Sequence, residues 1–141
     1  MAESGFMLDV VTLKKVVFRE EIKSIMAPGK EGYFTILAGH TPFVSSLQPG
    51  TIRISKPEGQ ALTLATSGGF LMTDGKKVIV LADTAELPEE IDVKRAQSAK
   101  DRAEKRLGER TQEIDIDRAK AALLRASNRL KVATMAKTPN V

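Results

Sequence analysis

The chain has 141 residues, a hydrophobic fraction of 42%, a charged fraction of 28% and a formal net charge of +4, which suits one ordinary domain with an appendage. It contains no cysteine and a single histidine, so disulfides, thiolate chemistry and a multi-histidine metal site within one chain are excluded. No apolar run approaches the roughly 20 residues of a membrane span, and the first residues do not resemble a signal peptide, so we expect a soluble intracellular protein.

Residues 6–86 predict short strands separated by tight turns. Nine of the ten glycines and four of the six prolines precede Pro88, and such residues build turns between strands. Residues 56–59 (Lys-Pro-Glu-Gly) and 74–75 (Asp-Gly) are strong hairpin signals. About nine strands without a helix-length period between them predict an antiparallel β-sandwich or a flattened barrel. The predicted strands are Met7–Thr12, Val16–Phe18, Ile22–Ala27, Tyr33–Leu37, Phe43–Leu47, Thr51–Ser55, Ala61–Ser67, Phe70–Thr73 and Val78–Ala82.

This β body offers little chemistry. His40 lies in the turn-like segment 37–42 and is predicted to be a turn or contact residue. Gly68-Gly69 could belong to a phosphate-binding loop, but no helix follows it to supply an anion-binding N-terminus, so close strand packing is the better interpretation. No serine or threonine has a base at a recognisable spacing, so we expect no catalytic residue.

From Pro88 onward the composition changes to charge, alanine and leucine. Pro88 and the acids through Asp92 are typical of a helix start. Gly108 is predicted to interrupt the first helix and to open a loop that ends at Asp115. The apolar spacing of the second helix indicates the seam of an antiparallel hairpin or a stripe that faces a partner. The stripes consist of Ala96, Ala99, Ala103 and Leu107 on the first helix, and Ile116, Ala119, Leu123, Ala126, Leu130 and Ala133 on the second.

Alanine dominates both stripes, so the two helices can approach closely but bury little apolar area. Each buried methylene stabilises by only about 0.8 kcal/mol. We therefore hypothesise that the helical arm detaches and adopts another arrangement. Amide hydrogen exchange as slow in the arm as in the sheet would count against this.

The positive charge of the chain lies in the arm. Basic and acidic residues number nine each through Pro88, which gives zero, and 13 against nine from Glu89 onward, which gives the whole +4. After Asp117 every charged side chain is basic, which indicates either an acidic partner surface or an ordinary solvated helix. Three arginines share one face and suit phosphates or carboxylates: Arg118, Arg125 and Arg129.

The string Ile-Asp-x-x-Arg-Ala occurs twice, at residues 91–96 and 114–119, once near the start of each helix. Spacing alone does not identify this string as a binding site. An acid in the first turn of a helix and an alanine in a helix seam are both favoured, so the string could occur twice by chance.

At this point the chain as a whole resembles the epsilon subunit of bacterial F-type ATP synthases. No single segment decides this, but their order and spacing together are specific. The segments that carry the resemblance are Leu8–Thr12, Val16–Phe18, Ala27-Pro28-Gly29-x-x-Gly32, Gly39-His40-x-Pro42, Ser67–Phe70, Val80–Asp83, Ile91-Asp92-x-x-Arg95-Ala96 and Arg125-Ala126-x-Asn128-Arg129-Leu130.

The resemblance implies an α+β fold, with a ten-stranded β-sandwich docking domain at 1–87 and a mobile, regulatory two-helix hairpin at 88–141. It implies a non-catalytic rotor subunit of a proton- or ion-translocating ATP synthase, peripheral at the cytoplasmic face of the inner (plasma) membrane. The sandwich would couple the gamma subunit to the membrane c-ring. The arm would extend into the catalytic alpha/beta head, meet acidic loops of beta and inhibit ATP hydrolysis. The partner contacts that follow are Glu31, His40, Arg118, Lys120, Arg125 and Arg129.

In some members of the family the folded arm binds ATP. The resemblance therefore implies a regulatory ATP site and no required cofactor. Its acidic and small residues would surround adenine and ribose, and its arginines would take the phosphates through charge-assisted hydrogen bonds. The residues carried over are Glu86, Ile91, Asp92, Arg95, Ala96, Arg125 and Arg129. The second copy of the string, at 114–119, does not match the family's position for this site.

Two segments depart from the family pattern. Ala38 stands where proline is common, and Tyr33 replaces a frequent acid, which puts a charged contact with the membrane ring at that position in doubt. The alternative from another class, a nucleic-acid-binding module built on the cationic helix, lacks stacking aromatics in the arm. Nucleic-acid binding with a steep salt dependence would revive that alternative.

Overall fold

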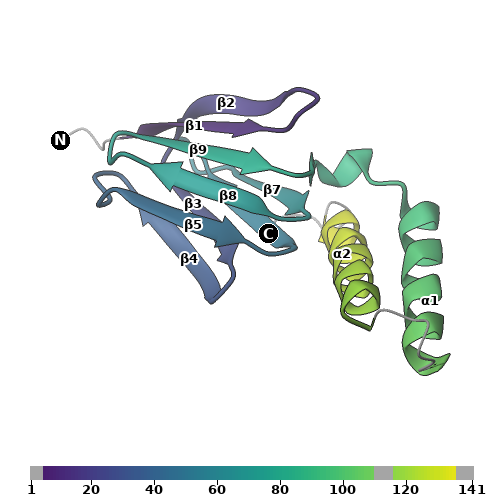
Figure 1. The fold of residues 1–141 in the computed structure, drawn as a ribbon. Helices are drawn as coiled ribbons and strands as arrows, with labels where there is room; N and C mark the ends of the chain where they lie inside the picture. Colours follow the sequence, from purple (N-terminus) through teal and green to yellow (C-terminus); the bar gives the residue numbers. More distant parts are fainter. Residues whose placement is uncertain (1–4, 110–115, 136–141) are drawn as a thin grey trace. The chain divides into compact units, whose positions relative to one another are not determined.

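The computed structural model describes residues 5–109 and 116–135. The chain forms two compact units, Met1–Glu86 and Leu87–Val141. The first unit is built from strands and the second from helices (Figure 1). Among the described residues no helix is both long and apolar enough to cross a membrane.

In its described residues, 5–86, the first unit contains ten strands, and nine of them overlap the predicted segments. The tenth strand, β10, has two residues, too few for an alternating pattern to reveal it, although the resemblance implied ten. The strands are β1 (Phe6–Val11), β2 (Val16–Ile22), β3 (Ser24–Gly29), β4 (Gly32–Leu37), β5 (Phe43–Leu47), β6 (Gly50–Ser55), β7 (Ala61–Thr66), β8 (Gly69–Thr73), β9 (Lys77–Ala82) and β10 (Ala85–Glu86).

The strands form one hydrogen-bonded path that folds into two layers. One layer has the order β10-β7-β6-β3 with β4 on the other side of β3, and the second has the order β5-β8-β9-β1-β2. The layers join where Gly29 of β3 pairs with Leu47 of β5. All pairings are antiparallel except that of β1 with β9, which is parallel. The predicted sandwich is therefore confirmed, with one correction to its purely antiparallel character.

The core lies between the two layers and follows from the period of the strands. In β9 the inward residues Val78 and Val80 are fully buried, and in β6 the same holds for Ile52 and Ile54, because alternate residues of a strand point to one face. Burying one such side chain stabilises the fold by about 1.5–3 kcal/mol. The other large, fully buried side chains of this unit are Leu8, Val10, Ile22, Ile25, Ile36, Leu64 and Leu71.

Gly69, at the start of β8, marks a close approach of two strands. Its φ is +135°, and a Cβ atom at this position would collide with the carbonyl oxygen of Leu81 and lie 2.9 Å from Cα of Ala82 on β9. Gly69 pairs with Ala82 in the β8–β9 ladder. Close packing, the preferred interpretation of the glycine pair, is confirmed.

The second unit begins with a short 3-10 turn and not with the α-helix itself. The turn η1 spans Pro88–Glu90, and α1 runs from Val93 to Glu109. Asp92 caps α1, because its Oδ1 accepts a hydrogen bond from the Arg95 amide at 3.0 Å. The prediction of a helix from Pro88 is therefore wrong by about one turn.

Gly108 lies inside α1, which continues to Glu109, so its predicted role as a helix breaker is wrong. A single glycine near a helix end costs only about 1 kcal/mol relative to alanine. The loop predicted up to Asp115 falls mostly on 110–115, which lie outside the described residues, as does the start of the second Ile-Asp-x-x-Arg-Ala string.

Helix α2 spans Ile116–Met135, packs against α1 and runs in the opposite direction (Figure 1). Ala96 and Ala103 of α1 are buried, so the predicted alanine stripe faces inward. Ala119, Ala126 and Ala133 of α2 are buried as well, whereas Ile116 is exposed; Asn128 and Val132 are buried although neither belongs to the predicted stripe.

Candidate functional site

The outer face of the second layer carries exposed apolar side chains. Phe70 of β8 pairs with Leu81 of β9, and Val44 of β5 pairs with Met72 of β8, so these side chains form neighbouring rows on one face. Val44 is 67%, Phe70 51% and Leu81 46% exposed. Contiguous exposed apolar surface of this kind marks an interaction site. This apolar band consists of Met7, Val44, Phe70, Met72, Ile79 and Leu81.

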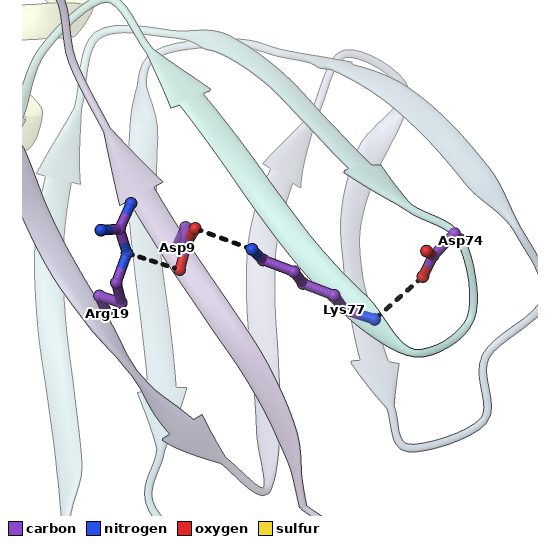
Figure 2. Close-up of polar contacts among 4 residues, drawn as sticks. All are labelled: Asp9, Arg19, Asp74 and Lys77. Carbon is purple, nitrogen blue, oxygen red and sulfur yellow. Dashed lines mark hydrogen bonds and ion pairs between the residues drawn. The ribbon is translucent and has the colours of Figure 1, made fainter.

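A buried carboxylate lies on β1 beside the apolar band. Asp9 is only 6% exposed. Arg19 Nε donates to its Oδ1 at 3.2 Å, and Lys77 Nζ lies 3.2 Å from its Oδ2, as Figure 2 shows. Strand register explains the arrangement, because Asp9 and Arg19 are direct partners across β1 and β2. The Asp9–Arg19–Lys77 cluster thus ties β1 to both of its neighbours.

The turn between β8 and β9 positions Lys77. Oδ1 of Asp74 accepts hydrogen bonds from the Lys76 and Lys77 amides at 2.8 and 3.0 Å; the second is drawn in Figure 2. These backbone hydrogen bonds lower the pKa of Asp74. Gly75 follows with φ of +98°, which confirms the hairpin predicted at Asp74-Gly75.

Electrostatics favour the ionised form of Asp9. Burial raises the pKa of its carboxyl, but hydrogen bonds and charge from Lys77 and Arg19 outweigh burial, so the pKa lies below its ordinary value of 3.8. A lowered pKa in the folded state stabilises the fold above the unfolded pKa, and the stabilisation is lost as the pH falls through the folded pKa. Asp9 therefore stabilises the sandwich at neutral pH and not in strong acid.

Replacing Asp9 by asparagine should lower the free energy of unfolding by about 1–2 kcal/mol at pH 7, because two charge-assisted hydrogen bonds are lost. The difference from wild type should shrink as the pH falls below 3.8 and through the lower pKa that Asp9 has in the folded state, because the wild-type carboxylate then becomes protonated. Urea unfolding at a series of pH values measures this, with the exposed turn substitution Glu58→Gln as the control. A difference that does not change with pH would contradict the argument.

The two partner contacts predicted on the sandwich lie at opposite ends of one strand. Glu31 is in the turn before β4, and His40 is in the loop after it. Six strand residues separate the turn from the loop, a span of about 20 Å. His40 is held in place, since its Nδ1 donates to the Thr41 carbonyl at 2.7 Å and its ring packs edge-on against Phe43. A flat partner surface that covers one end of β4 therefore contacts either Glu31 or His40 but not both.

The residues carried over for a nucleotide divide between the two units. Glu86 ends β10 in the first unit, whereas the other six lie in the second. Ile91 and Ala96 are buried, whereas Asp92, Arg95 and Arg125 are exposed and Arg129 is half-buried. Because α1 and α2 are antiparallel, the later half of α2, which contains Arg129, runs alongside the first turns of α1, whereas Arg125 lies at the middle of α2. One contact within this set of residues is the cap of α1, in which the Arg95 amide donates a hydrogen bond to the Asp92 carboxylate.

The cations predicted to face a partner lie along α2. Arg118 and Lys120 are exposed on its first turns, and Arg125 is exposed two turns later. They stand on a helix with a single acid in the described part of its sequence, Asp117.

Removing the Asp92 cap should weaken the second unit. Asp92→Ala should cost about 1 kcal/mol, whereas Asp92→Asn should cost much less, because asparagine caps helices as well as aspartate does. Circular dichroism at 222 nm through a urea titration measures the helical unfolding of each variant. Equal losses in both variants would show that the carboxylate charge, and not the cap, is what matters.

Comparisons with known proteins agree with this architecture. A family model described as the β-sandwich domain of the ATP synthase delta/epsilon chain matches residues 5–88, and one described as its long α-helix domain matches residues 89–134. The ATP synthase epsilon chain of Desulforudis audaxviator is 47% identical over 107 residues, 76% of this chain and 77% of the relative. That of Carboxydothermus hydrogenoformans is 50% identical over 104 residues, 74% and 77% of the two chains.

Two solved structures share the fold at low identity. A chain of the Euglena gracilis mitochondrial ATP synthase (OSCP/F1/c-ring) has a TM-score of 0.79 at 22% identity. The match covers 96% of this chain and 83% of the Euglena chain. A chain of the Tetrahymena thermophila central stalk and c-ring has a TM-score of 0.61 at 16% identity, covering 98% and 100%. With the two domain models matching in order and curated relatives nearly half identical over three quarters of its length, the chain belongs to the epsilon-chain family of ATP synthase subunits.

Proposed function

We propose that this epsilon-family chain is a central-stalk subunit whose sandwich docks on the gamma subunit through the apolar band. The exposure of Phe70, Leu81 and Val44 carries this proposal, because a monomer leaves such a patch in water only at a cost of about 25 cal/mol per Å². The band lies on regular strands, so it is a rigid surface that loses little conformational entropy on binding. The family is one of ATP synthase subunits, so a partner within that assembly is the natural occupant.

Charged substitutions in the band should weaken binding to the isolated gamma subunit. Phe70→Asp and Leu81→Asp should each raise Kd by about 30-fold or more, since large apolar residues at an interface centre contribute about 2 kcal/mol or more. Leu37→Asp is the matched control, because Leu37 is 59% exposed on β4 of the other layer. Isothermal titration calorimetry measures the affinities. Equal weakening by all three variants would remove the band from the interface.

The turn at Glu31 and the loop at His40 are proposed to contact two different neighbours, one of them the c-ring. Their separation along β4 supports this. Cysteines placed at 31 and 40 in the assembled enzyme should crosslink to different subunits. Crosslinking of both to the same subunit at similar yield would contradict the proposal.

We further propose that the second unit inhibits ATP hydrolysis through its cationic helix. Exposed Arg118, Lys120 and Arg125 support a contact with acidic loops of the catalytic beta subunits, since opposite charges steer and hold such contacts. As a peripheral subunit, the chain would work at the cytoplasmic face of the membrane.

A regulatory ATP site on the folded arm is the remaining proposal, with no cofactor required. The exposed guanidinium groups of Arg95 and Arg125 support it, because arginine forks bind phosphates well. Calorimetry with ATP should show binding to wild type and at least about tenfold weaker binding to Arg125→Ala, as expected for the loss of a charge-assisted hydrogen bond. The exposed α1 substitution Lys105→Ala is the control. Equal affinities for wild type and Arg125→Ala would remove Arg125 from the site.

A further inference from the structure

Arg19 has more hydrogen-bonding capacity than the sandwich uses. Its Nε pairs with Asp9 at 3.2 Å, and its side chain is still 57% exposed. Among the described residues no second acid pairs with Arg19. The nearest acid on the same face of β2 is Glu21, whose carboxylate lies against Gly5. The terminal nitrogens of Arg19 point away from the Asp9 carboxylate (Figure 2).

Two half-exposed cations, Arg19 and Lys77, pair with one buried carboxylate, Asp9, so neither cation has a carboxylate to itself. The carboxylate behind Arg19 also restrains its side chain. A restrained guanidinium loses less rotamer entropy on binding than a free one.

We propose that Arg19 is the polar anchor of the apolar band and receives a carboxylate from the docking chain. The inference rests on the proposed function and deepens it by naming the chemistry of the partner. The occupant is a protein segment that places an Asp or Glu side chain beside an apolar surface. Its two oxygens match the parallel donors of the guanidinium fork, and the exposed side chain of Met7, a diagonal neighbour of Arg19 on β1, supplies the apolar contact.

A lipid surface fits these residues less well. Anionic membranes are held by clusters of about four to eight cations, whereas this cluster has two cations, both paired with Asp9. Lys77 does not replace Arg19 as the anchor, because its ammonium is a point charge without a fork.

Calorimetry of the full-length chain against the isolated gamma subunit tests the anchor. Arg19→Gln should raise Kd by about tenfold or more, and Arg19→Lys by a smaller factor, since lysine keeps the charge but loses the fork. The matched control is Arg53→Gln, because Arg53 is an exposed strand arginine in the other layer. Wild-type affinity should also fall more steeply with salt than that of Arg19→Gln.

The outcomes separate the anchor from the docking proposal beneath it. If wild type does not bind gamma, the proposed docking fails. If wild type binds, Phe70→Asp weakens binding and Arg19→Gln matches Arg53→Gln, docking stands and the anchor is overturned. Urea midpoints within experimental error of wild type for Arg19→Lys exclude misfolding as the cause. Vesicles containing phosphatidylglycerol are the last probe. If Arg19→Gln weakens binding to these vesicles but leaves binding to gamma unchanged, the protein anchor is overturned as well.

Discussion

Gly69→Ala should destabilise the first unit by about 3 kcal/mol, one of the largest effects of any single substitution in this chain. Two costs combine. The φ of +135° disfavours any residue with a Cβ by about 1–2 kcal/mol, and the added methyl group would meet the backbone of β9 at Leu81 and Ala82. Backbone cannot swing aside as a side chain does, so the strands must separate, at about 1–3 kcal/mol for such overpacking.

Gly59→Ala separates these two costs. Gly59 also has positive φ, +99°, but nothing lies within 4 Å of where its Cβ would stand. This control should lose only the conformational part, about 1 kcal/mol. Urea unfolding of both variants, followed by circular dichroism, gives the comparison. If the two substitutions cost the same, the close approach of β8 to β9 contributes nothing and the packing interpretation is wrong.

The strands could be predicted from the sequence because their information is local. Alternation in Val78–Ala82 and the Asp74-Gly75 turn both depend on residues close together in the chain. The same holds for the alanine stripe that begins at Ala96. The helix start was placed a turn too early because Pro88 and its acids suit a 3-10 turn as well as an α-helix.

The apolar band could not be predicted in the same way because it depends on which strands become neighbours. The parallel pairing of β1 with β9 joins residues about 70 positions apart, and only that pairing brings Lys77 to Asp9. One local signal was available. Asp9 interrupts the apolar run Met7–Val11, and an acid in such a strand is rarely left unpaired. The outward residue Phe70 gave a weaker signal, since single exposed apolar residues are common.

The two units carry different kinds of surface, and this difference suits a subunit that both couples and regulates. The first unit offers a rigid apolar band whose contacts depend mainly on burial. The second offers a cationic helix on a hairpin with an alanine seam, whose partner contacts depend on charge. In the proposed function, the surface held by apolar contacts stays bound to gamma while the electrostatic arm changes partners.

Removal of the second unit should therefore release hydrolysis without releasing the stalk. With a chain ending at Leu87, ATP hydrolysis by the catalytic head should be about fivefold or more faster than with the full chain, as expected for a regulatory coupling of about 1–3 kcal/mol. Binding of the shortened chain to gamma should remain within about threefold of the full chain, a difference below 1 kcal/mol. Steady-state hydrolysis and calorimetry measure the two effects. Equal rates with both chains would refute the brake and leave the docking role intact.

Charge reversal in the full chain tests whether the brake is electrostatic. Lys120→Glu with Arg125→Glu should raise hydrolysis towards the rate with the shortened chain, because both side chains are exposed on α2 and would then repel acidic loops. Lys94→Glu with Arg102→Glu is the matched control, as both are exposed on α1 and change the net charge equally. Raised salt should weaken inhibition by the wild-type chain and change little with the α2 variant. If both double variants release hydrolysis equally, overall charge and not the face of α2 governs inhibition.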